Sequence, residues 1–371
     1  MKLALIQDQL LTPAGSERMF LYMAQEFREA ALFTLCYNPR ATWPGFLDYR
    51  ITTHWVNPFI QTHERFKTAF PLATWLMQAW DFREYDVILT SSATTAKYIR
   101  RHRARHVCYC YFPTRAIWTS DKYFSGAAPD LRHRLFRLAH AHLTRRDLEA
   151  ARRVDQFIAI SESSREAIQR FYDRDADVLC PPVDTERFGA ARTTNKNGRY
   201  LLVSRLQRWK RVGVAVDAFT TLGLPLDIIG TGPEEARLRA AAGPNIRFLG
   251  VVDDDALARA YGEAKAVVFT PELEYGLIPL EAAAAGTPSI ALGRGGVLET
   301  VVGLNDSAGR RATGVFFDEQ TPEALVAAVH RFEGVTIAAN DLVAHAAAFS
   351  IAGFQRRLRE LTLGNASNTP A

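Results

Sequence analysis

The chain has 371 residues, of which 48% are hydrophobic and 23% charged, and its formal net charge is +5. A chain of this length is too long to fold around one ordinary hydrophobic core, and we predict two domains of about 150 to 200 residues each. The composition excludes the disordered classes. No apolar run of about 18 residues is present, and the apolar start of the chain soon meets Gln7 and Asp8. We therefore expect a cytoplasmic protein without a membrane span or signal peptide.

The cysteines and the placement of the basic residues further limit the classes of protein to which this chain can belong. Cys36, Cys108, Cys110 and Cys180 are too scattered for a disulfide framework, and no second pair completes a zinc site, so we expect them in the core. Residues 97–153 hold fourteen Lys and Arg against four Asp and Glu. This local excess of positive charge indicates either an acidic partner or a structural use of those cations.

Short β-rich runs alternate with helical patterns along the first half. A strand at residues 2–6 is followed by a loop with Pro13 and Gly15, and then by apolar residues at helical spacing from Phe20 to Phe27. Further strands are expected at residues 31–35, 87–90, 107–109, 157–160 and 178–180. Such alternation predicts a mostly parallel sheet covered on both faces.

A turn-rich stretch between Pro181 and Gly198 marks the expected domain boundary. The alternation then restarts, with strands at 200–203 and 226–229 and helical faces at 212–219, 257–264, 277–284 and 325–332. This pattern predicts a second doubly wound domain. We assign residues 1–182 to the first domain and 199–345 to the second, with a helix over 346–363 that can cross back to the first domain and a disordered tail at 364–371.

Ligands of a doubly wound sheet bind where its strands end, and four segments of the second domain fall there. In the first, residues 204–211, Arg205 and Lys210 precede a helix. Two cations beside a helix N-terminus suit a diphosphate. The alternative is a solvated basic turn.

In the second segment, residues 230–234, glycine lets the backbone approach a ligand closely. A dinucleotide fingerprint would need glycine at Glu235, which argues against an NAD or FAD site.

The third segment, residues 269–288, places acids in a loop before a helix that carries Glu281 among apolar residues. An unpaired carboxylate would be costly there. We therefore expect Glu281 to accept hydrogen bonds, either from a ribose diol or from a neighbouring arginine. The fourth segment, residues 293–296, precedes a helix and suits an anion. The alternative for this segment is a flexible turn.

Five motifs in this order resemble those of glycosyltransferase family 4, the group 1 glycosyltransferases, and especially its bacterial mannosyltransferase-like branch. The family patterns are a Gly-Gly-Glu loop, CYCHTPMRYAW, VSRLxxYKR, GxGPE and ExFGxxPxEAMAxGxP. The corresponding segments here are residues 15–17, 108–118, 203–211, 230–234 and 273–288. The resemblance covers nearly the whole chain.

The resemblance implies an α/β fold of GT-B architecture, with two Rossmann-like domains facing across a cleft and the donor held mainly by residues 199–302. Arg205 and Lys210 would neutralise the donor diphosphate, Glu281 would hold the ribose hydroxyls, and Gly15 would lie against the phosphates. Transfer with retention at the anomeric carbon, without a metal or other cofactor, is expected, because the cations stabilise the leaving diphosphate. Residues 253–255, three aspartates, are interpreted as a helix start rather than a metal site.

Two positions depart from the family pattern. Leu273 stands where the family has the first Glu of its paired-glutamate motif, and Tyr111 stands where it has His. The family side chains at these positions are expected to contact the donor sugar. The more apolar wall here leads to the hypothesis of a sugar that lacks a usual polar group, such as a 6-deoxyhexose. Glu272 or Glu274 can replace the missing Glu after a local shift.

The candidate site residues follow from the motifs and the resemblance together. The catalytic candidates are Arg205, Lys210, Tyr111 and Glu274. The donor-binding candidates are Gly15, Arg205, Lys210, Gly232, Glu274, Tyr275, Gly276, Leu277, Ile278 and Glu281. The candidates on the acceptor side are Arg115 and Trp118.

A basic helix from Leu131 to Arg146 and an aromatic-rich stretch around Pro71 raise the question of a membrane surface. The aromatic residues of that stretch are Phe59, Phe66, Phe70, Trp75, Trp80 and Phe82. Because acceptors in such pathways are commonly lipid-linked sugars, these segments can rest on anionic lipid at the inner membrane face. The alternative is ordinary core with a solvated basic face. No nucleic-acid-binding motif accompanies the charge, so a nucleic acid partner is not expected.

The sequence thus predicts a cytoplasmic, retaining glycosyltransferase that uses a nucleoside diphosphate sugar, with a GDP-sugar of the mannose or rhamnose type favoured. Its acceptor would be a glycan or lipid-linked sugar in bacterial polysaccharide or lipopolysaccharide synthesis. The alternative is a catalytically weak homologue that acts as a nucleotide-sugar- or glycan-binding subunit, which the departures at Tyr111 and Leu273 keep open.

Overall fold

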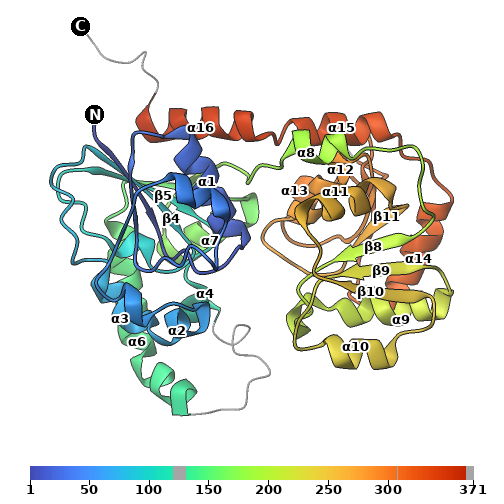
Figure 1. Ribbon diagram of the computed structural model, residues 1–371, viewed down its shortest axis with the longest axis horizontal. Coiled ribbons are helices and arrows are strands. Elements are labelled where there is room, and N and C mark those ends of the chain that lie inside the picture. Colours follow the sequence, from blue (N-terminus) through green and yellow to red (C-terminus); the bar gives the residue numbers. More distant parts are fainter. Residues whose placement is uncertain (120–130, 307, 365–371) are drawn as a thin grey trace, which may run out of the picture. The chain divides into compact units, whose positions relative to one another are not determined.

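The computed structural model describes residues 1–119, 131–306 and 308–364, and the side chains of residues 131–138 lie outside that description. By its internal contacts the chain divides into two units, Met1–Cys180 with Phe354–Ala371, and Pro181–Gly353. Each unit contains one parallel sheet with helices on its faces (Figure 1). The two doubly wound domains expected from the sequence are therefore confirmed, while the expected disordered tail falls almost wholly outside the described residues.

The first unit has a seven-stranded sheet in the order β3-β2-β1-β4-β5-β6-β7, and all neighbours are parallel. Its strands are β1 (Leu3–Gln7), β2 (Ala31–Thr34), β3 (Ile51–Thr53), β4 (Val87–Ser92), β5 (Arg105–Cys110), β6 (Gln156–Ala159) and β7 (Ala176–Val178). The short edge strand β3 was not predicted, because only three residues carry it. Strand β7 lies two residues earlier than expected.

The helices of the first unit fill the connections between these strands. They are α1 (Gly15–Glu26), α2 (His63–Thr68), α3 (Phe70–Leu76), α4 (Arg115–Trp118), α6 (Leu131–Arg152) and α7 (Glu162–Tyr172), with 3-10 turns η1 (Pro44–Asp48), η2 (Asn57–Phe59) and η3 (Ala96–Tyr98). Central strand β4 is buried along its whole length, as expected for a parallel sheet covered on both faces.

The second unit has a six-stranded parallel sheet in the order β10-β9-β8-β11-β12-β13. Its strands are β8 (Tyr200–Val203), β9 (Leu226–Ile229), β10 (Ile246–Gly250), β11 (Ala266–Phe269), β12 (Ser289–Leu292) and β13 (Gly314–Phe317). Its helices are α8 (Thr185–Ala190), α9 (Val212–Leu222), α10 (Glu235–Ala241), α11 (Asp254–Glu263), α12 (Leu277–Ala284), α13 (Val297–Thr300), α14 (Pro322–Glu333) and α15 (Ala339–Ala347), with the 3-10 turn η4 (Arg208–Lys210).

The expected linker between the domains is instead an ordered part of the second unit. Asp184 caps α8 through a bond from the Arg187 backbone N–H, and Phe188 packs edge-on against Tyr261. Val183 also forms an isolated β-bridge to Ser350. This short helix was not predicted from the sequence, because its residues are typical of turns. Phe188 is its single buried residue, and one buried residue does not produce a helical pattern of apolar positions.

The expected final helix over residues 346–363 is in fact divided between two helices, α15 and α16 (Ile351–Leu363). From Phe354 onward α16 packs on the first unit. Phe354 lies edge-on to Tyr109, with ring centroids 5.8 Å apart, and the Gln355 side chain donates to the Tyr22 carbonyl at 3.0 Å. The helix therefore contributes core contacts to the first unit.

A buried ion pair organises the helices of the first unit. Lys97 Nζ lies 2.9 Å from Asp147 Oδ1, and both side chains are almost completely buried. Lys97 also donates to Thr114 Oγ1, and the carboxylate of Asp147 accepts from a set of donors on different segments. These donors are the Tyr98 hydroxyl, the Thr114 hydroxyl, Trp118 Nε1 and the Tyr172 hydroxyl. The network thus ties together η3, α4, α6 and α7, and it uses one cation of the basic segment internally.

Removing one member of this network should destabilise the first unit strongly. Lys97→Met leaves the Asp147 charge buried without its counter-ion, so we expect a loss of about 3–5 kcal/mol in the free energy of unfolding. The matched control is Lys67→Met, which removes a 2.8 Å pair with Glu64 on the surface and should change the stability by less than about 1 kcal/mol. Urea denaturation followed by circular dichroism measures both, and equal effects would contradict the assignment.

Candidate active site

The second unit contains a cavity of about 360 Å³ at the carboxyl edge of its sheet. Chain order reverses between neighbouring strands β8 and β11, so the loops after them diverge and leave a crevice. The lining residues come from the ends of β8 to β11 and from the helices that follow. They are Val203, Ser204, Arg205, Lys210, Ile229, Gly230, Thr231, Val251, Val252, Leu257, Phe269, Pro271 and Ile278.

Two of the predicted cations line this cavity. Arg205 is exposed, and within the described part of the chain its guanidinium has no hydrogen bond or ion pair. Lys210 is half-buried and its Nζ lies 4.3 Å from the centre of the Trp209 ring. Helix α9 begins two residues later without a side-chain cap. Positive charge therefore lies beside a largely apolar hollow, an arrangement that suits an anion with an apolar or aromatic part.

The two glycines of the 230–234 motif allow the loop after β8 to pack closely against the loop after β9. Gly230 has φ of +128°, and a Cβ there would lie 1.9 Å from the Ser204 carbonyl oxygen. A Cβ on Gly232 would lie 2.3 Å from the Leu206 carbonyl oxygen. The Leu206 N–H donates to the Thr231 carbonyl at 2.9 Å, which joins the two loops. The space of the missing Gly232 side chain is therefore filled by the Arg205 loop, while Gly230 and Thr231 line the cavity, and the donor-binding role of Gly232 stays a prediction.

A second pair of loops meets in the same way after β11 and β12. A Cβ on Gly295 would lie 2.4 Å from the Leu273 carbonyl oxygen, and one on Gly296 would lie 2.0 Å from the Glu274 carbonyl oxygen. Leu273 and Gly295 also form a β-bridge. Residues 293–296 are therefore a brace for the acidic loop, and the helix that follows, α13, has only four residues. This corrects the anion-site interpretation of the segment.

The acidic loop itself divides between packing and exposed positions. The Leu273 side chain packs against the apolar cluster of Phe269, Ala291, Val297 and Val301. Tyr275 is buried, and its hydroxyl donates to the Pro181 carbonyl at 3.0 Å. Gly276 begins α12 and leaves no room for a side chain, because Thr300 Oγ1 is 2.6 Å from its Cβ position. Glu274 and Leu277 are half-buried, Glu272 is exposed, and Ile278 lines the cavity.

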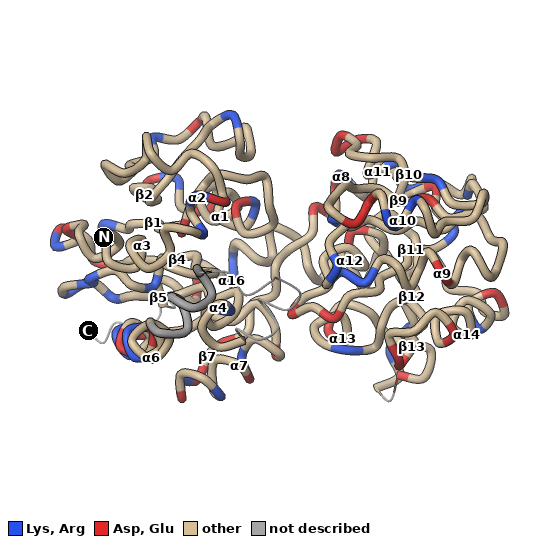
Figure 2. The backbone as a smooth tube through the Cα atoms, turned by 90° about the horizontal axis from the view of Figure 1, so that it is seen from below, with Lys and Arg blue, Asp and Glu red and all other residues tan. Residues whose placement is uncertain are grey.

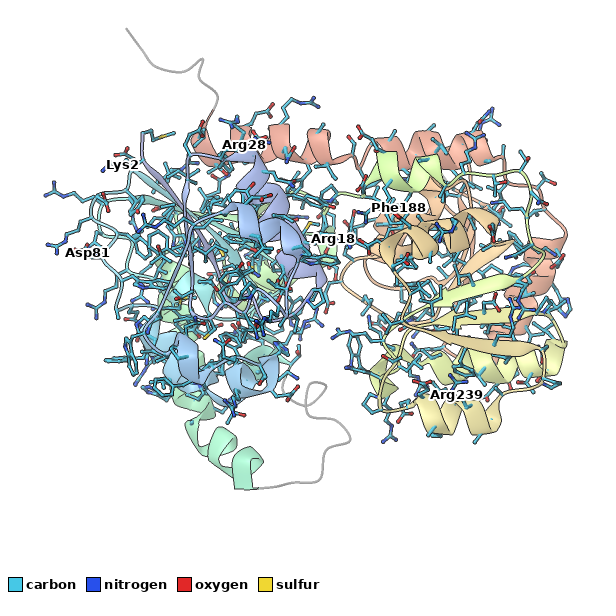
Figure 3. The ribbon with its side chains drawn as sticks, in the orientation of Figure 1. Lys2, Arg18, Arg28, Asp81, Phe188 and Arg239 are labelled. Atoms are coloured by element: carbon cyan, nitrogen blue, oxygen red, sulfur yellow. The ribbon has the colours of Figure 1, made fainter. Side chains whose placement is uncertain are left out.

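Glu281 accepts a hydrogen bond, as its apolar surroundings predicted. One donor is the hydroxyl of Tyr261, 2.8 Å from Glu281 Oε2. Tyr261 is fully buried and packs edge-on against Phe188, which is labelled in Figure 3. The tyrosine therefore holds one oxygen of a half-buried carboxylate in a fixed position. Glu281 does not line the 360 Å³ cavity.

In the first unit, the corresponding sheet edge is shaped by two buried acids. The Asp8 carboxylate, just after β1, accepts the backbone N–H groups of residues 93–96 at 2.5 to 2.9 Å and so fixes the loop after β4. The Glu17 carboxylate accepts from Gln9, Thr12 and Ser16 at 2.7 to 3.0 Å. Burial raises the pKa of Glu17 above its usual range.

The loop that carries Gly15 is held from outside by a neighbouring segment. Thr42 donates to the Thr12 carbonyl at 3.2 Å, and Trp43 Nε1 donates to the Ala14 carbonyl at 3.0 Å. The Arg18 guanidinium lies 4.0 Å from the centre of the Trp43 ring. A Cβ on Gly15 would meet no atom within 4 Å. No described residue of the first unit therefore requires glycine there, in contrast to Gly230.

Tyr111 connects the loops after β1 and β5. Its hydroxyl donates to the Ser16 carbonyl at 3.1 Å and lies 3.0 Å from Ser91 Oγ. Burial raises the pKa of this phenol above its usual range. The hydroxyl of this catalytic candidate is thus used in positioning the Gly15 loop.

The two acceptor-side candidates are placed differently. Trp118 donates its only N–H to the buried Asp147 at 2.7 Å, and its ring packs on Phe171 with centroids 5.1 Å apart. Trp118 therefore holds helix α4 in place, and its acceptor-side role stays a prediction. Arg115 is half-buried, with its guanidinium 5.2 Å from the centre of the Phe112 ring.

Two further features complete the geometry. Asp253 caps α11 by accepting the Ala256 N–H at 2.7 Å, which confirms the helix-start interpretation, and Asp254 pairs with Arg187 at 2.7 Å.

The described residues contain no group of three or more His, Cys, Asp or Glu arranged to hold a metal ion. No helix in the described ranges combines the length and apolarity needed to cross a bilayer.

The sequence missed the wall of the cavity formed by Val251, Val252 and Leu257. These residues follow β10, an edge strand with alternating burial that was not predicted. The only signal was the apolar run at residues 248–252 before three aspartates.

Comparisons with known proteins agree with this architecture. Residues 13–187 match the family described as Glycosyltransferase Family 4, and residues 197–333 match Glycosyl transferases group 1. The glycogen synthase of Mycobacterium tuberculosis is 31% identical over 167 residues, 41% of this chain and 40% of that protein. The chain thus spans well under half the length of this curated relative.

Solved structures extend the likeness to the whole chain. HepE of Anabaena, in complex with UDP and glucose, has a TM-score of 0.69 at 17% identity, with 98% of this chain and all of that one covered. The lipopolysaccharide outer core galactosyltransferase WaaB has a TM-score of 0.66 at 16% identity and covers 97% of this chain and 98% of that one. At these identities the likeness shows the fold, which is the two-domain GT-B type.

The raised pKa of Glu17 predicts a pH-dependent stability. Because the folded state binds this proton more tightly than the unfolded chain, the stabilisation is complete below the ordinary pKa of 4.5 and is lost as pH rises through the folded value. Glu17→Gln keeps one acceptor oxygen, places an amide NH2 where the second oxygen stood and avoids burying the charge, so its stability relative to wild type should increase from pH 4.5 to 7. Urea midpoints in a pH series measure this, with Glu29→Gln on the surface as control. If the difference in urea midpoint between Glu17→Gln and wild type does not change with pH, the result would contradict the argument that burial raises the pKa of Glu17.

Proposed function

Because the chain belongs to glycosyltransferase family 4, the group 1 glycosyltransferases, we propose that it transfers one sugar from a nucleoside diphosphate sugar to a glycan or lipid-linked acceptor. The observation that carries the proposal is the cavity of the second unit, where Arg205 and Lys210 border an apolar hollow at the sheet's switch point. A nucleoside diphosphate has the matching chemistry, with two phosphates for the cations and a base for the apolar wall.

The same cations supply the chemistry of the leaving group. When the bond between the anomeric carbon and the diphosphate breaks, negative charge grows on the diphosphate oxygens. Arg205 and Lys210 stabilise that charge as it develops. We propose that this takes the place of a metal ion, and that transfer proceeds with retention at the anomeric carbon, as the family resemblance implies.

Glu281 is proposed as the ribose ligand. Its carboxylate is already oriented by the Tyr261 hydroxyl, so binding a diol costs little further ordering of the side chain. Gly15 is proposed as a phosphate contact, since a Cβ there would point into open space that nothing in the fold fills.

A binding panel of nucleoside diphosphate sugars would identify the base and the sugar of the donor. The sequence resemblance favours a guanosine diphosphate sugar, whereas HepE was solved with UDP and glucose, which supports a uridine diphosphate sugar. A 6-deoxyhexose was suggested by Tyr111 and Leu273, but the Tyr111 hydroxyl is bonded to Ser16 and the Leu273 side chain packs in its own unit. The panel therefore includes uridine, guanosine and thymidine diphosphate sugars with and without the 6-hydroxyl.

For the acceptor, we propose a glycan or lipid-linked sugar of bacterial polysaccharide or lipopolysaccharide synthesis, made at the cytoplasmic face of the inner membrane. The likeness of fold to an outer core galactosyltransferase supports this placement. The basic segment from Lys97 to Arg153 supports an anionic surface nearby.

The second candidate function is a binding subunit with weak catalysis. It is favoured by Leu273, which occupies the position of a family glutamate and packs into an apolar cluster. Release of free nucleoside diphosphate in the presence of a crude acceptor pool supports the enzyme, and binding without release supports the subunit.

Arg205→Ala should weaken nucleoside diphosphate binding without changing stability. The side chain is exposed and has no partner among the described residues, so its removal breaks no internal contact. A charge-assisted contact to a diphosphate is worth about 1.5–3 kcal/mol, which predicts a Kd increase of roughly 10- to 100-fold by calorimetry.

The matched control is Arg208→Ala, an exposed neighbour that does not line the cavity. It should bind within about threefold of wild type. Equal losses in both variants would indicate general electrostatic attraction, and an unchanged Kd for Arg205→Ala would overturn the diphosphate role.

A further inference from the structure

The backbone carbonyl of Lys210 has its partner outside its own loop. Lys210 ends the 3-10 turn η4, and its N–H donates to the Gln207 carbonyl at 2.9 Å within that loop. Its carbonyl accepts from the side-chain hydroxyl of Thr270 at 3.0 Å, across 60 residues of sequence. Thr270 directly follows β11, which neighbours β8 in the sheet (Figure 1). This hydrogen bond therefore joins the two loops that border the switch point of the sheet.

The chain turns sharply at the residue after Lys210. Arg211 has φ of +54° and ψ of +30°, in the left-handed region that side chains disfavour. A non-glycine residue keeps this conformation where its surroundings impose it. The described hydrogen bonds of α9 begin one residue later than Lys210, with the Val214 N–H donating to the Arg211 carbonyl at 3.1 Å. The turn thus leaves the Lys210 carbonyl outside the helix, and Thr270 satisfies it.

Thr270 is held rigidly by its own surroundings. The residue is 1% exposed, and its carbonyl accepts from the Gln320 side chain at 2.9 Å. Phe269, the residue before it, is buried in an apolar cluster with Ala291 and Val297. The hydroxyl that binds the Lys210 carbonyl therefore extends from a fixed point of the core.

This fixed point lies at the proposed donor site. Phe269, Pro271 and Lys210 line the 360 Å³ cavity, whereas Thr270 is not among the described lining residues. The Lys210 ammonium lies 4.3 Å from the centre of the Trp209 ring, which is 46% exposed. The hydrogen bond from Thr270 therefore reaches the backbone of a residue whose side chain borders the cavity.

The loop after β8 carries concentrated positive charge. Arg205, Arg208, Lys210 and Arg211 lie within seven residues, and Lys and Arg positions are blue in Figure 2. Like charges at such spacing repel one another, which favours an open loop before an anion binds. A hydrogen bond from the core to the Lys210 carbonyl opposes that opening.

We propose that Thr270 is a positioning residue for Lys210, and that its hydroxyl fixes the backbone from which the lysine ammonium reaches the donor diphosphate. Thr270 acts on the donor through Lys210, because its hydroxyl is used by the lysine backbone. A lysine held in place before binding loses less conformational freedom when the anion arrives. This inference rests on the proposed function, since it takes the cavity as the diphosphate site.

The test is calorimetry of the full chain with uridine diphosphate or guanosine diphosphate, whichever wild type binds more tightly. Thr270→Val keeps the shape of the side chain and removes the hydroxyl, so Lys210 is ordered only on binding and the Kd should rise about 3- to 10-fold. Thr270→Ser keeps the hydroxyl and should bind within about twofold of wild type. Thr270→Ala removes the same hydroxyl and replaces the valine variant if that one does not fold.

A double-mutant cycle with Lys210→Met separates positioning from a general structural effect. Because Thr270 acts through Lys210, Thr270→Val should change the Kd by less than about 1.5-fold in the Lys210→Met background. The matched control is Thr74→Val in the first unit, which removes a buried hydroxyl that donates to the Pro71 carbonyl at 2.8 Å. This control should bind like wild type.

Hydrogen–deuterium exchange of the ligand-free protein gives a second readout. Residues 207–212 should exchange faster in Thr270→Val than in Thr270→Ser, because only the serine retains the donor to the Lys210 carbonyl. Equal exchange in the two variants overturns the positioning role.

Three binding results would also overturn it. These are an unchanged Kd for Thr270→Val, an equal loss in Thr270→Ser, and the same factor with and without Lys210→Met. If wild type binds neither nucleoside diphosphate, the proposed function fails and this role fails with it. Binding by wild type that Thr270→Val leaves unchanged contradicts the positioning role alone.

Discussion

Backbone meets backbone where the loops of the second unit come together, and glycine makes this approach possible. Gly230 and Gly232 admit the carbonyl groups of Ser204 and Leu206, while Gly295 and Gly296 admit those of Leu273 and Glu274. Any Cβ at these positions would overlap a carbonyl oxygen. The Arg205 loop and the acidic loop are thereby fixed against their neighbours, so the cavity between β8 and β11 has rigid walls, and the cations beside it need little ordering when an anion arrives.

Charged side chains have two different roles in this molecule. In the first, ionic groups such as Asp8 and the Lys97–Asp147 pair are buried and satisfied by several donors, so they hold loops and helices in register. In the second, Arg205 stands exposed without a partner in the described chain. A satisfied charge stabilises a fold, whereas an unsatisfied cation beside an apolar hollow has free energy to gain from a ligand. This contrast separates the scaffold from the proposed donor site.

The alternation of strands and helices was predictable from apolar period, and α12 lies where the pattern placed it. The cations at Arg205 and Lys210 were also predictable, because motif order locates them after a strand. The short strands β3 and β13, the six-residue helix α8 and the cavity wall at Val251 were not, since each shows too little apolar periodicity to detect. Nor could sequence show that Trp118 donates to Asp147, or that Tyr261 donates to Glu281, because both contacts join residues far apart in the chain.

The central claim is that a nucleoside diphosphate binds at the carboxyl edge of the second unit's sheet. Hydrogen–deuterium exchange of the full chain, with and without saturating nucleoside diphosphate, tests it most directly. The account predicts slower exchange in the segments that form the cavity and carry Glu281, which are residues 203–212, 229–234, 250–257 and 269–282. Unchanged exchange in these segments, with protection confined to other parts of the chain, would contradict it.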